Sequence, residues 1–190
     1  MPYDDVPAFV RSLRAKADQD VGPVALELLI LTAARTGELI NARWEEFDIG
    51  KAMWTVPGSR MKAGREHRVP LSPPALEVLS TARERGPAGV FVFPGRNVAK
   101  PSSNMTLLMT LRRLGVSYTA HGFRSSFRDW TSERTSFPHE VCESALAHVV
   151  RNKVEAAYRR GDLFEKRREL MDAWSRFVCR STADVVALRA

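Results

Sequence analysis

Hydrophobic residues recur at helical spacing in the N-terminal part of the chain. They predict a first helix over Asp4–Gln19 and a second that begins near Pro23 and ends at Arg35. Pro23 suits the first helical turn, where the missing amide of proline is tolerated. The apolar face of the first helix would be formed by Phe9, Leu13 and Ala17. Gly37 interrupts the pattern, so a short separate helix is expected over Glu38–Ala42.

The pattern then changes from helical spacing to alternation. Three short stretches predict strands, namely Trp44–Ile49, Ala52–Val56 and His67–Leu71. In the last of these, Arg68 would point outward, and Val69 and Leu71 inward. The polar segment between the second and third strands, PGSRMKAGRE, would be the loop of a β-hairpin.

The rest of the chain returns to helical spacing. The predicted helices are Pro74–Arg85, Ser103–Leu114, His121–Glu133, Glu140–Ala147, Lys153–Arg160 and Asp162–Val178. Ser103 and Asp162 are of the residue types that cap helix N-termini. The expected fold class is α+β, a mostly helical domain with a small three-stranded antiparallel sheet.

Composition narrows the function classes. No stretch approaches the roughly 18 apolar residues of a membrane span, and the first residues lack a secretory signal, which predicts a cytoplasmic protein without a membrane partner. The 29 basic and 22 acidic residues give a net charge of +7, which favours a polyanionic partner. Two cysteines predict no disulfide framework. Because the spacing His139-x2-Cys142-x5-His148 lacks a fourth ligand, no metal site is expected.

The predicted helix from His121 carries two contrasting faces. Its buried stripe would be formed by Phe123, Phe127 and Trp130. His121, Arg124 and Arg128 fall on another face. Such a cationic row either lies in solvent or binds an anion, and the helix alone does not decide between the two.

Two further cationic positions raise the same choice. Arg35 follows an apolar run, and a partly buried guanidinium needs an anionic partner, either Glu38 or a phosphate. The hairpin loop supplies Lys62 between Arg60 and Arg65, where a lysine is either solvated or reaches a substrate.

Tyr158 lies directly before an arginine pair, Arg159 and Arg160. A free tyrosine has a pKa of about 10 and is a poor nucleophile at neutral pH, but nearby cations stabilise its phenolate. Preorganised Arg and His donors can neutralise the charge that develops on an attacked phosphodiester, and a Lys or His can protonate the departing oxygen. This set of residue types suits DNA strand transfer without a metal or other cofactor.

With these residues, the chain resembles the catalytic domain of the tyrosine recombinases, the phage integrase family, and in particular the integrases of prophages and genomic islands. The motifs that carry the resemblance are LTAARTGEL, RMKAGREHRVPLS, HGFRSSFRDW and LAHVVRNKVEAAYRRGDLFEKRRELMDAW. They span nearly the whole chain in the order typical of the family. In this sequence Ala147 precedes His148, where many family members carry glycine.

The resemblance implies a role for each matching residue. Arg35, Arg124 and His148 would hold the scissile phosphate, and Lys62 would protonate the 5′-hydroxyl leaving group. His121 would assist proton transfer at Tyr158, which would form a 3′-phosphotyrosine link. The expected DNA contacts outside this set are Arg60, Arg65, Arg128 and Arg159.

The resemblance also implies an assembly. Residues 1–190 would form a single catalytic domain, with the family's core-binding and arm-binding domains absent from this chain. It would act on double-stranded attachment sites, as a homotetramer on DNA and a monomer when free. The helix Asp162–Val178 is expected to pack within its own subunit, and residues 181–190 are a candidate docking tail.

Two alternatives stay open at this stage. One is a type IB topoisomerase-like enzyme, which would use the same chemistry to relax supercoiled DNA. The other is a DNA-binding remnant of an integrase without catalytic activity.

Overall fold

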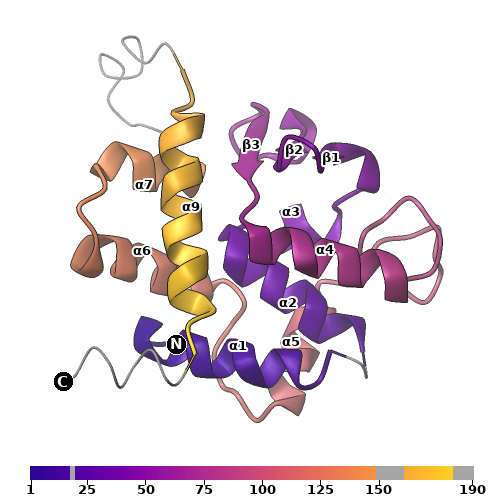
Figure 1. The fold of residues 1–190 in the computed structure, drawn as a ribbon. Helices are drawn as coiled ribbons and strands as arrows, with labels where there is room; N and C mark the ends of the chain where they lie inside the picture. The colour runs from indigo at the N-terminus through magenta and orange to yellow at the C-terminus, as the bar shows by residue number, and fades with distance from the viewer. Residues whose placement is uncertain (18–19, 149–160, 182–190) are drawn as a thin grey trace.

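The computed structural model describes residues 1–17, 20–148 and 161–181 of the chain (Figure 1). Helices surround a central helix, and a small sheet lies at one end of the molecule. The helices are α1 (Val6–Arg14), α2 (Val21–Thr32), α3 (Thr36–Ile40), α4 (Pro73–Arg85), α5 (Met105–Arg113), α6 (Gly122–Arg134), α7 (His139–Ala145) and α9 (Phe164–Val178). The predicted helix Lys153–Arg160 lies outside the described residues.

Helix α2 forms the centre of the core. Its sequence, VGPVALELLILT, has no polar face, and every residue from Gly22 to Thr32 is buried. The Asp20 carboxylate accepts a hydrogen bond from the Gly22 amide at the start of the helix. Helices α1, α4, α5 and α9 pack around it. The only acidic residue of α2, Glu27, is buried and pairs with Arg14 at 2.7 Å.

Within the described residues, strands β1 (Phe47–Asp48), β2 (Met53–Val56) and β3 (His67–Pro70) form an antiparallel sheet in the order β1-β2-β3. Trp54 pairs with Val69, and both side chains are buried on the core face. This confirms the predicted α+β class, with a mostly helical chain and one small sheet. The hairpin loop between β2 and β3 begins with a short 3₁₀ turn, Gly58–Arg60.

Helix α9 closes the core from the C-terminal side. It crosses α2 and contacts α7 and β3, so it packs within its own subunit as predicted (Figure 1). The Trp174 indole donates to the Ile30 carbonyl of α2 at 2.8 Å. Its ring stacks on Phe177, lies edge-on to Phe127 and packs at a tilt against Trp130. The predicted stripe of α6 is confirmed as buried, because Phe123, Phe127 and Trp130 expose 5% or less.

Several predicted boundaries are wrong. The first helix ends at Arg14 rather than Gln19. The second ends at Thr32, because Ala33 adopts the left-handed conformation with φ 50°. Gly37 therefore lies inside α3 and does not interrupt the pattern. The first strand is much shorter than predicted, since Trp44–Glu46 form a 3₁₀ turn.

The two predicted helix caps have different outcomes. Asn104 holds the N-cap position of α5, but the Ser103 hydroxyl, one residue earlier, accepts the Met105 amide at 3.2 Å. Asp162 does not cap α9, which begins at Phe164. Its carboxylate instead accepts two hydrogen bonds from Arg68 at 2.8 and 2.7 Å and one from Arg167 at 2.8 Å. The charges of two arginines therefore outcompete the amides of the helix terminus for this carboxylate.

Among the described residues, no helix combines the length and the apolar character that crossing a membrane would require.

Candidate active site

Arg35 is positioned by the turn that separates α2 from α3. Left-handed Ala33 ends α2, and Arg35 then takes the N-cap position of α3 with extended backbone. One Glu38 oxygen accepts the Arg35 amide at 2.8 Å, and the other accepts its guanidinium Nη1 at 2.6 Å. Glu38, considered above as the anionic partner, does pair with Arg35. The Arg35 side chain remains 26% exposed, so part of the guanidinium faces outward.

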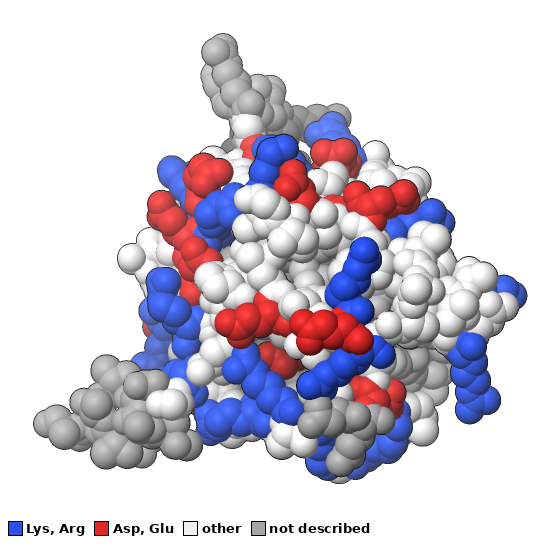
Figure 2. All heavy atoms as spheres, turned by 45° about the vertical axis from the view of Figure 1, so that its right-hand side comes forward, with Lys and Arg blue, Asp and Glu red and all other residues white. Residues whose placement is uncertain are grey.

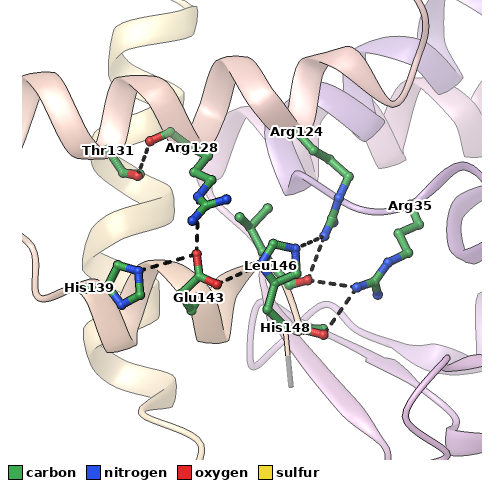
Figure 3. A network of polar contacts seen from close by, with 9 residues as sticks. Arg35, Arg124, Arg128, Thr131, His139, Glu143, Leu146 and His148 are labelled. Atoms are coloured by element: carbon green, nitrogen blue, oxygen red, sulfur yellow. Dashed lines mark hydrogen bonds and ion pairs between the residues drawn. The ribbon is translucent and has the colours of Figure 1, made fainter. Parts of the chain in front are cut away.

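Arg124 supplies a second guanidinium from the first turn of α6, and it is buried. Its Nη1 donates to the Ala33 carbonyl, and its Nη2 donates to the Leu146 carbonyl at 2.7 Å. Arg35 Nη2 donates to the same Leu146 carbonyl and to that of Ala147, each at 3.2 Å. Two arginines that are far apart in the sequence therefore meet at one backbone oxygen (Figure 3).

The electrostatics of this pair favour an anion. The acceptor carbonyls belong to the C-terminal ends of α2 and α7, where the partial negative charge of the helix dipoles helps to hold the two guanidinium groups side by side. Burial lowers the pKa of Arg124 to about 10, and the adjacent charge of Arg35 acts in the same direction. The guanidinium stays charged at neutral pH, but two neighbouring cations repel each other. A phosphate bound between them would relieve that repulsion through bidentate hydrogen bonds.

His148 joins the two arginines from the segment that follows α7. Its Nε2 lies 3.5 Å from Arg124 Nη2, and its Nδ1 lies 2.9 Å from a carboxylate oxygen of Glu143. The structure thus brings together three of the predicted phosphate-holding residues, Arg35, Arg124 and His148.

Lys62 lies on the hairpin loop and is exposed. It lines an open hollow of about 540 Å³ together with Arg35, Glu38 and Asn41. Arg60 lines the same hollow, but its guanidinium is bound to Glu46 and to the Glu38 carbonyl, so it connects the loop to α3. The loop therefore places a solvent-accessible ammonium at the rim of the arginine site.

The other predicted residues lie around this centre or outside the described residues. His121 is exposed directly before α6, and its backbone carbonyl accepts a hydrogen bond from the Arg124 amide at 3.0 Å. Arg65 is exposed on the hairpin loop. Arg128 pairs with Glu143 at 3.4 Å and keeps 54% of its side chain exposed. Tyr158 and Arg159 both lie outside the described residues.

Two residues near the site were not singled out from the sequence. His67, at the start of β3, is largely buried near Arg35 and Glu38. Glu143 contacts His148 and Arg128. The pattern offered a weak signal for Glu143, since it lies one helical turn after His139 and five residues before His148.

In the described part of the chain, no group of three or more His, Cys, Asp or Glu side chains is arranged to hold a metal ion. His139 and His148 both approach the Glu143 carboxylate, while Cys142 is a free, buried thiol.

Comparisons of the whole chain with known proteins agree with this arrangement of Arg35, Arg124 and His148. Residues 1–163 match the phage integrase family, a family of tyrosine recombinases. The chain belongs to this family. It is 34% identical over 178 residues to prophage integrase IntA of Escherichia coli (strain K12) and 36% identical over 177 residues to IntZ of the same organism. These matches cover 92% of this chain but only 43% of IntA and 44% of IntZ, so the chain spans less than half of the length of either relative.

Solved structures of integrases share the fold of this family member. The integrase from mycobacterium phage Brujita superposes with a TM-score of 0.63 and 21% identity, covering 89% of this chain and 56% of that one. A lambda integrase dimer bound to a core site gives a TM-score of 0.57 and 21% identity, covering 79% of this chain and 57% of that one. The mostly helical architecture with a small sheet is therefore that of an integrase catalytic domain.

Proposed function

We propose that this integrase family member catalyses site-specific recombination of double-stranded DNA in the cytoplasm through a 3′-phosphotyrosine intermediate. The observation that carries this proposal is the convergence of Arg35 and Arg124 on the Leu146 carbonyl, beside His148. Such a cluster of preorganised donors suits the charge that builds up on the non-bridging oxygens of an attacked phosphodiester.

The proposed reaction is a transesterification. The Tyr158 oxygen forms a bond to phosphorus while the bond from phosphorus to the 5′ oxygen breaks. The tyrosine proton leaves with assistance from His121, and Lys62 protonates the departing 5′ oxygen. The exposed position of Lys62 at the rim of the hollow supports this role, because a proton donor must reach the leaving group beside the phosphate. Bond energy is conserved in the phosphotyrosine, so the reverse reaction can join a new strand.

The DNA contacts follow from the exposed cations around this centre. Arg65 on the hairpin loop, Arg128 on α6 and Arg159 beside the nucleophile would contact backbone phosphates. Arg60 would contribute mainly by holding the loop that carries Lys62, since its guanidinium is already bound within the protein. Four copies would act together on paired attachment sites, a single copy would be free in solution, and residues 181–190 would dock on a neighbouring copy.

The test is trapping of the covalent intermediate. A nicked attachment-site duplex, which loses the short leaving strand after cleavage, is incubated with the wild-type chain and with Tyr158→Phe. We expect a slower-migrating protein–DNA band on a denaturing gel for wild type and none for Tyr158→Phe, although both bind DNA in a native gel.

The other outcomes would replace the proposal. Adduct that persists in Tyr158→Phe would exclude Tyr158 as the nucleophile. DNA binding without adduct in either protein would indicate a binding remnant or a domain that needs further segments. Relaxation of a supercoiled plasmid without paired sites would favour the topoisomerase-like alternative.

A further inference from the structure

The Glu143 carboxylate lies at the centre of a small network on α7. His148 Nδ1 is 2.9 Å from one carboxylate oxygen, while Arg128 Nε and His139 Nε2 approach the other at 3.4 and 3.9 Å. Figure 3 shows Glu143 between Arg128 and His139 on one side and His148 on the other. The Glu143 side chain is only 19% exposed, so these contacts are partly shielded from water.

The short contact determines which ring nitrogen of His148 carries the proton. A carboxylate oxygen accepts hydrogen bonds, and an unprotonated Nδ1 at 2.9 Å would place two lone pairs against each other. Burial raises the pKa of Glu143, but the hydrogen bond from His148 and the charges of Arg128 and His139 outweigh it, so the pKa is lowered and the group is ionised. His148 is therefore protonated on Nδ1, and Nε2 is the nitrogen that faces Arg124 at 3.5 Å.

The backbone holds the ring in the same direction. The His148 amide donates to the Glu143 carbonyl at 3.0 Å, so one residue binds both the main chain and the side chain of His148. This return of the chain toward α7 requires the left-handed conformation of Ala147, with φ 49°. The orientation of the imidazole in the free chain is consequently set by α7.

We propose that Glu143 is a positioning residue that fixes the tautomer and the orientation of His148, and so directs Nε2 toward the phosphate subsite of Arg35 and Arg124. The proposal rests on the proposed function for the identity of the phosphate. When His148 carries a second proton, Nε2 donates to a phosphate oxygen, and Glu143 stabilises the positive ring from the opposite side. Arg128 then influences the reaction through the Glu143 carboxylate, in addition to any contact with DNA.

The test substitutes Glu143→Gln, which keeps the size of the side chain and removes its charge. Glu140→Gln is the matched control, because Glu140 is an exposed residue on the same helix. The first readout is the ¹⁵N spectrum of the His148 ring in the free protein, assigned with His148→Gln. The second is the single-turnover rate of adduct formation on the nicked duplex, together with the Kd for the same DNA.

We expect the wild-type ring to be the Nδ1-protonated tautomer and Glu143→Gln to shift it toward the Nε2-protonated form. The adduct rate should fall about tenfold or more with Kd nearly unchanged, because loss of an orienting carboxylate affects the reacting geometry more than binding. Glu140→Gln should match wild type in both readouts.

Two results would overturn the proposal. One is a wild-type His148 ring that is protonated on Nε2 when neutral, and the other is a Glu143→Gln protein with unchanged ring spectrum and adduct rate. Failure of the proposed function is distinguishable, because a wild-type protein without adduct formation would still report the tautomer of His148 in the free state. The wild-type spectrum also decides the matter if Glu143→Gln does not fold.

Discussion

His67 illustrates, at the scale of a single residue, how burial sets a protonation state beside the arginine pair. Burial lowers the pKa of His67 to about 4, and the charge of Arg167 acts in the same direction. A free histidine titrates near pH 6.5. His67 in the folded chain therefore stays neutral at mildly acidic pH, where the unfolded chain would be protonated.

This difference predicts a specific acid sensitivity. Between pH 6.5 and 4 the unfolded state binds more protons at His67 than the folded state does, so its contribution to the free energy of unfolding falls as the pH falls through that window. Urea unfolding of wild type and His67→Gln at pH 7 and pH 4.5 measures it. Relative to the variant, wild type should lose about 2 kcal/mol over this interval. Equal losses in both proteins would show that His67 titrates normally when folded.

The contacts and burial of single side chains were predictable where residue type and spacing indicate them. The burial of the α6 aromatic stripe followed from spacing alone, and spacing also offered Glu38 as one of two possible partners of Arg35. The backbone carbonyls that accept hydrogen bonds from the two arginines could not be predicted. Every residue has a carbonyl, and nothing in the sequence marks that of Leu146 as the acceptor. The role of Glu143 depends on the reversal of the chain at Ala147, a conformation that alanine does not signal.

At the scale of elements, α9 is joined to β3 by a cluster of charges. The Arg167 side chain is 1% exposed and donates to the Asp162 carboxylate at 2.8 Å, the Asp162 carbonyl at 2.7 Å and the Arg68 carbonyl at 2.5 Å. Arg68 binds the same carboxylate from the exposed side. Asp162 thus contacts one buried guanidinium, that of Arg167, and one exposed guanidinium, that of Arg68.

The buried and the exposed ion pair of Asp162 should contribute unequally to stability. Asp162→Ala should lower the free energy of unfolding by about 2–4 kcal/mol, because it removes a carboxylate that is hydrogen-bonded to the buried Arg167 guanidinium. Arg68→Ala should cost less than about 1 kcal/mol, as expected for an exposed ion pair. Denaturant unfolding of both variants checks this, and similar losses would contradict the buried-charge explanation.

Element boundaries were predictable only where local preference and tertiary contacts agree. The hairpin of β2 and β3 and the span of α4 were close to expectation, since alternation and turn residues specify them locally. The start of α9 was not, because Asp162 is drawn to Arg68 and Arg167 by contacts that cross the fold. The end of α2 was missed because alanine rarely adopts the left-handed conformation of Ala33.

At the scale of the whole molecule, net charge is a poor guide to the DNA-contacting face. The chain carries +7, yet the face shown in Figure 2 has basic and acidic side chains interspersed. The cations of the candidate active site lie between α3, α6, the segment after α7 and the hairpin loop. The binding surface is therefore better located from these elements than from overall charge.

Salt dependence tests this location. Affinity for duplex DNA should fall with rising salt, and Arg65→Gln on the hairpin loop should reduce the slope of log K against log salt by about one. Arg113→Gln is the control, because Arg113 is the last residue of α5, which lies away from the hairpin (Figure 1), and it pairs with Asp20. An equal effect of both substitutions would indicate diffuse attraction without a defined binding face.

The burial of α2 by α9 has a consequence for how the protein is made. Synthesis proceeds from the N-terminus, so an almost wholly apolar α2 leaves the ribosome long before Trp174 exists to donate to Ile30. Until α9 emerges, that surface is open to chaperones or to other nascent chains. Tyr158 is also translated before α9, so the proposed nucleophile is present in the growing polypeptide before the core that supports the arginine pair can close.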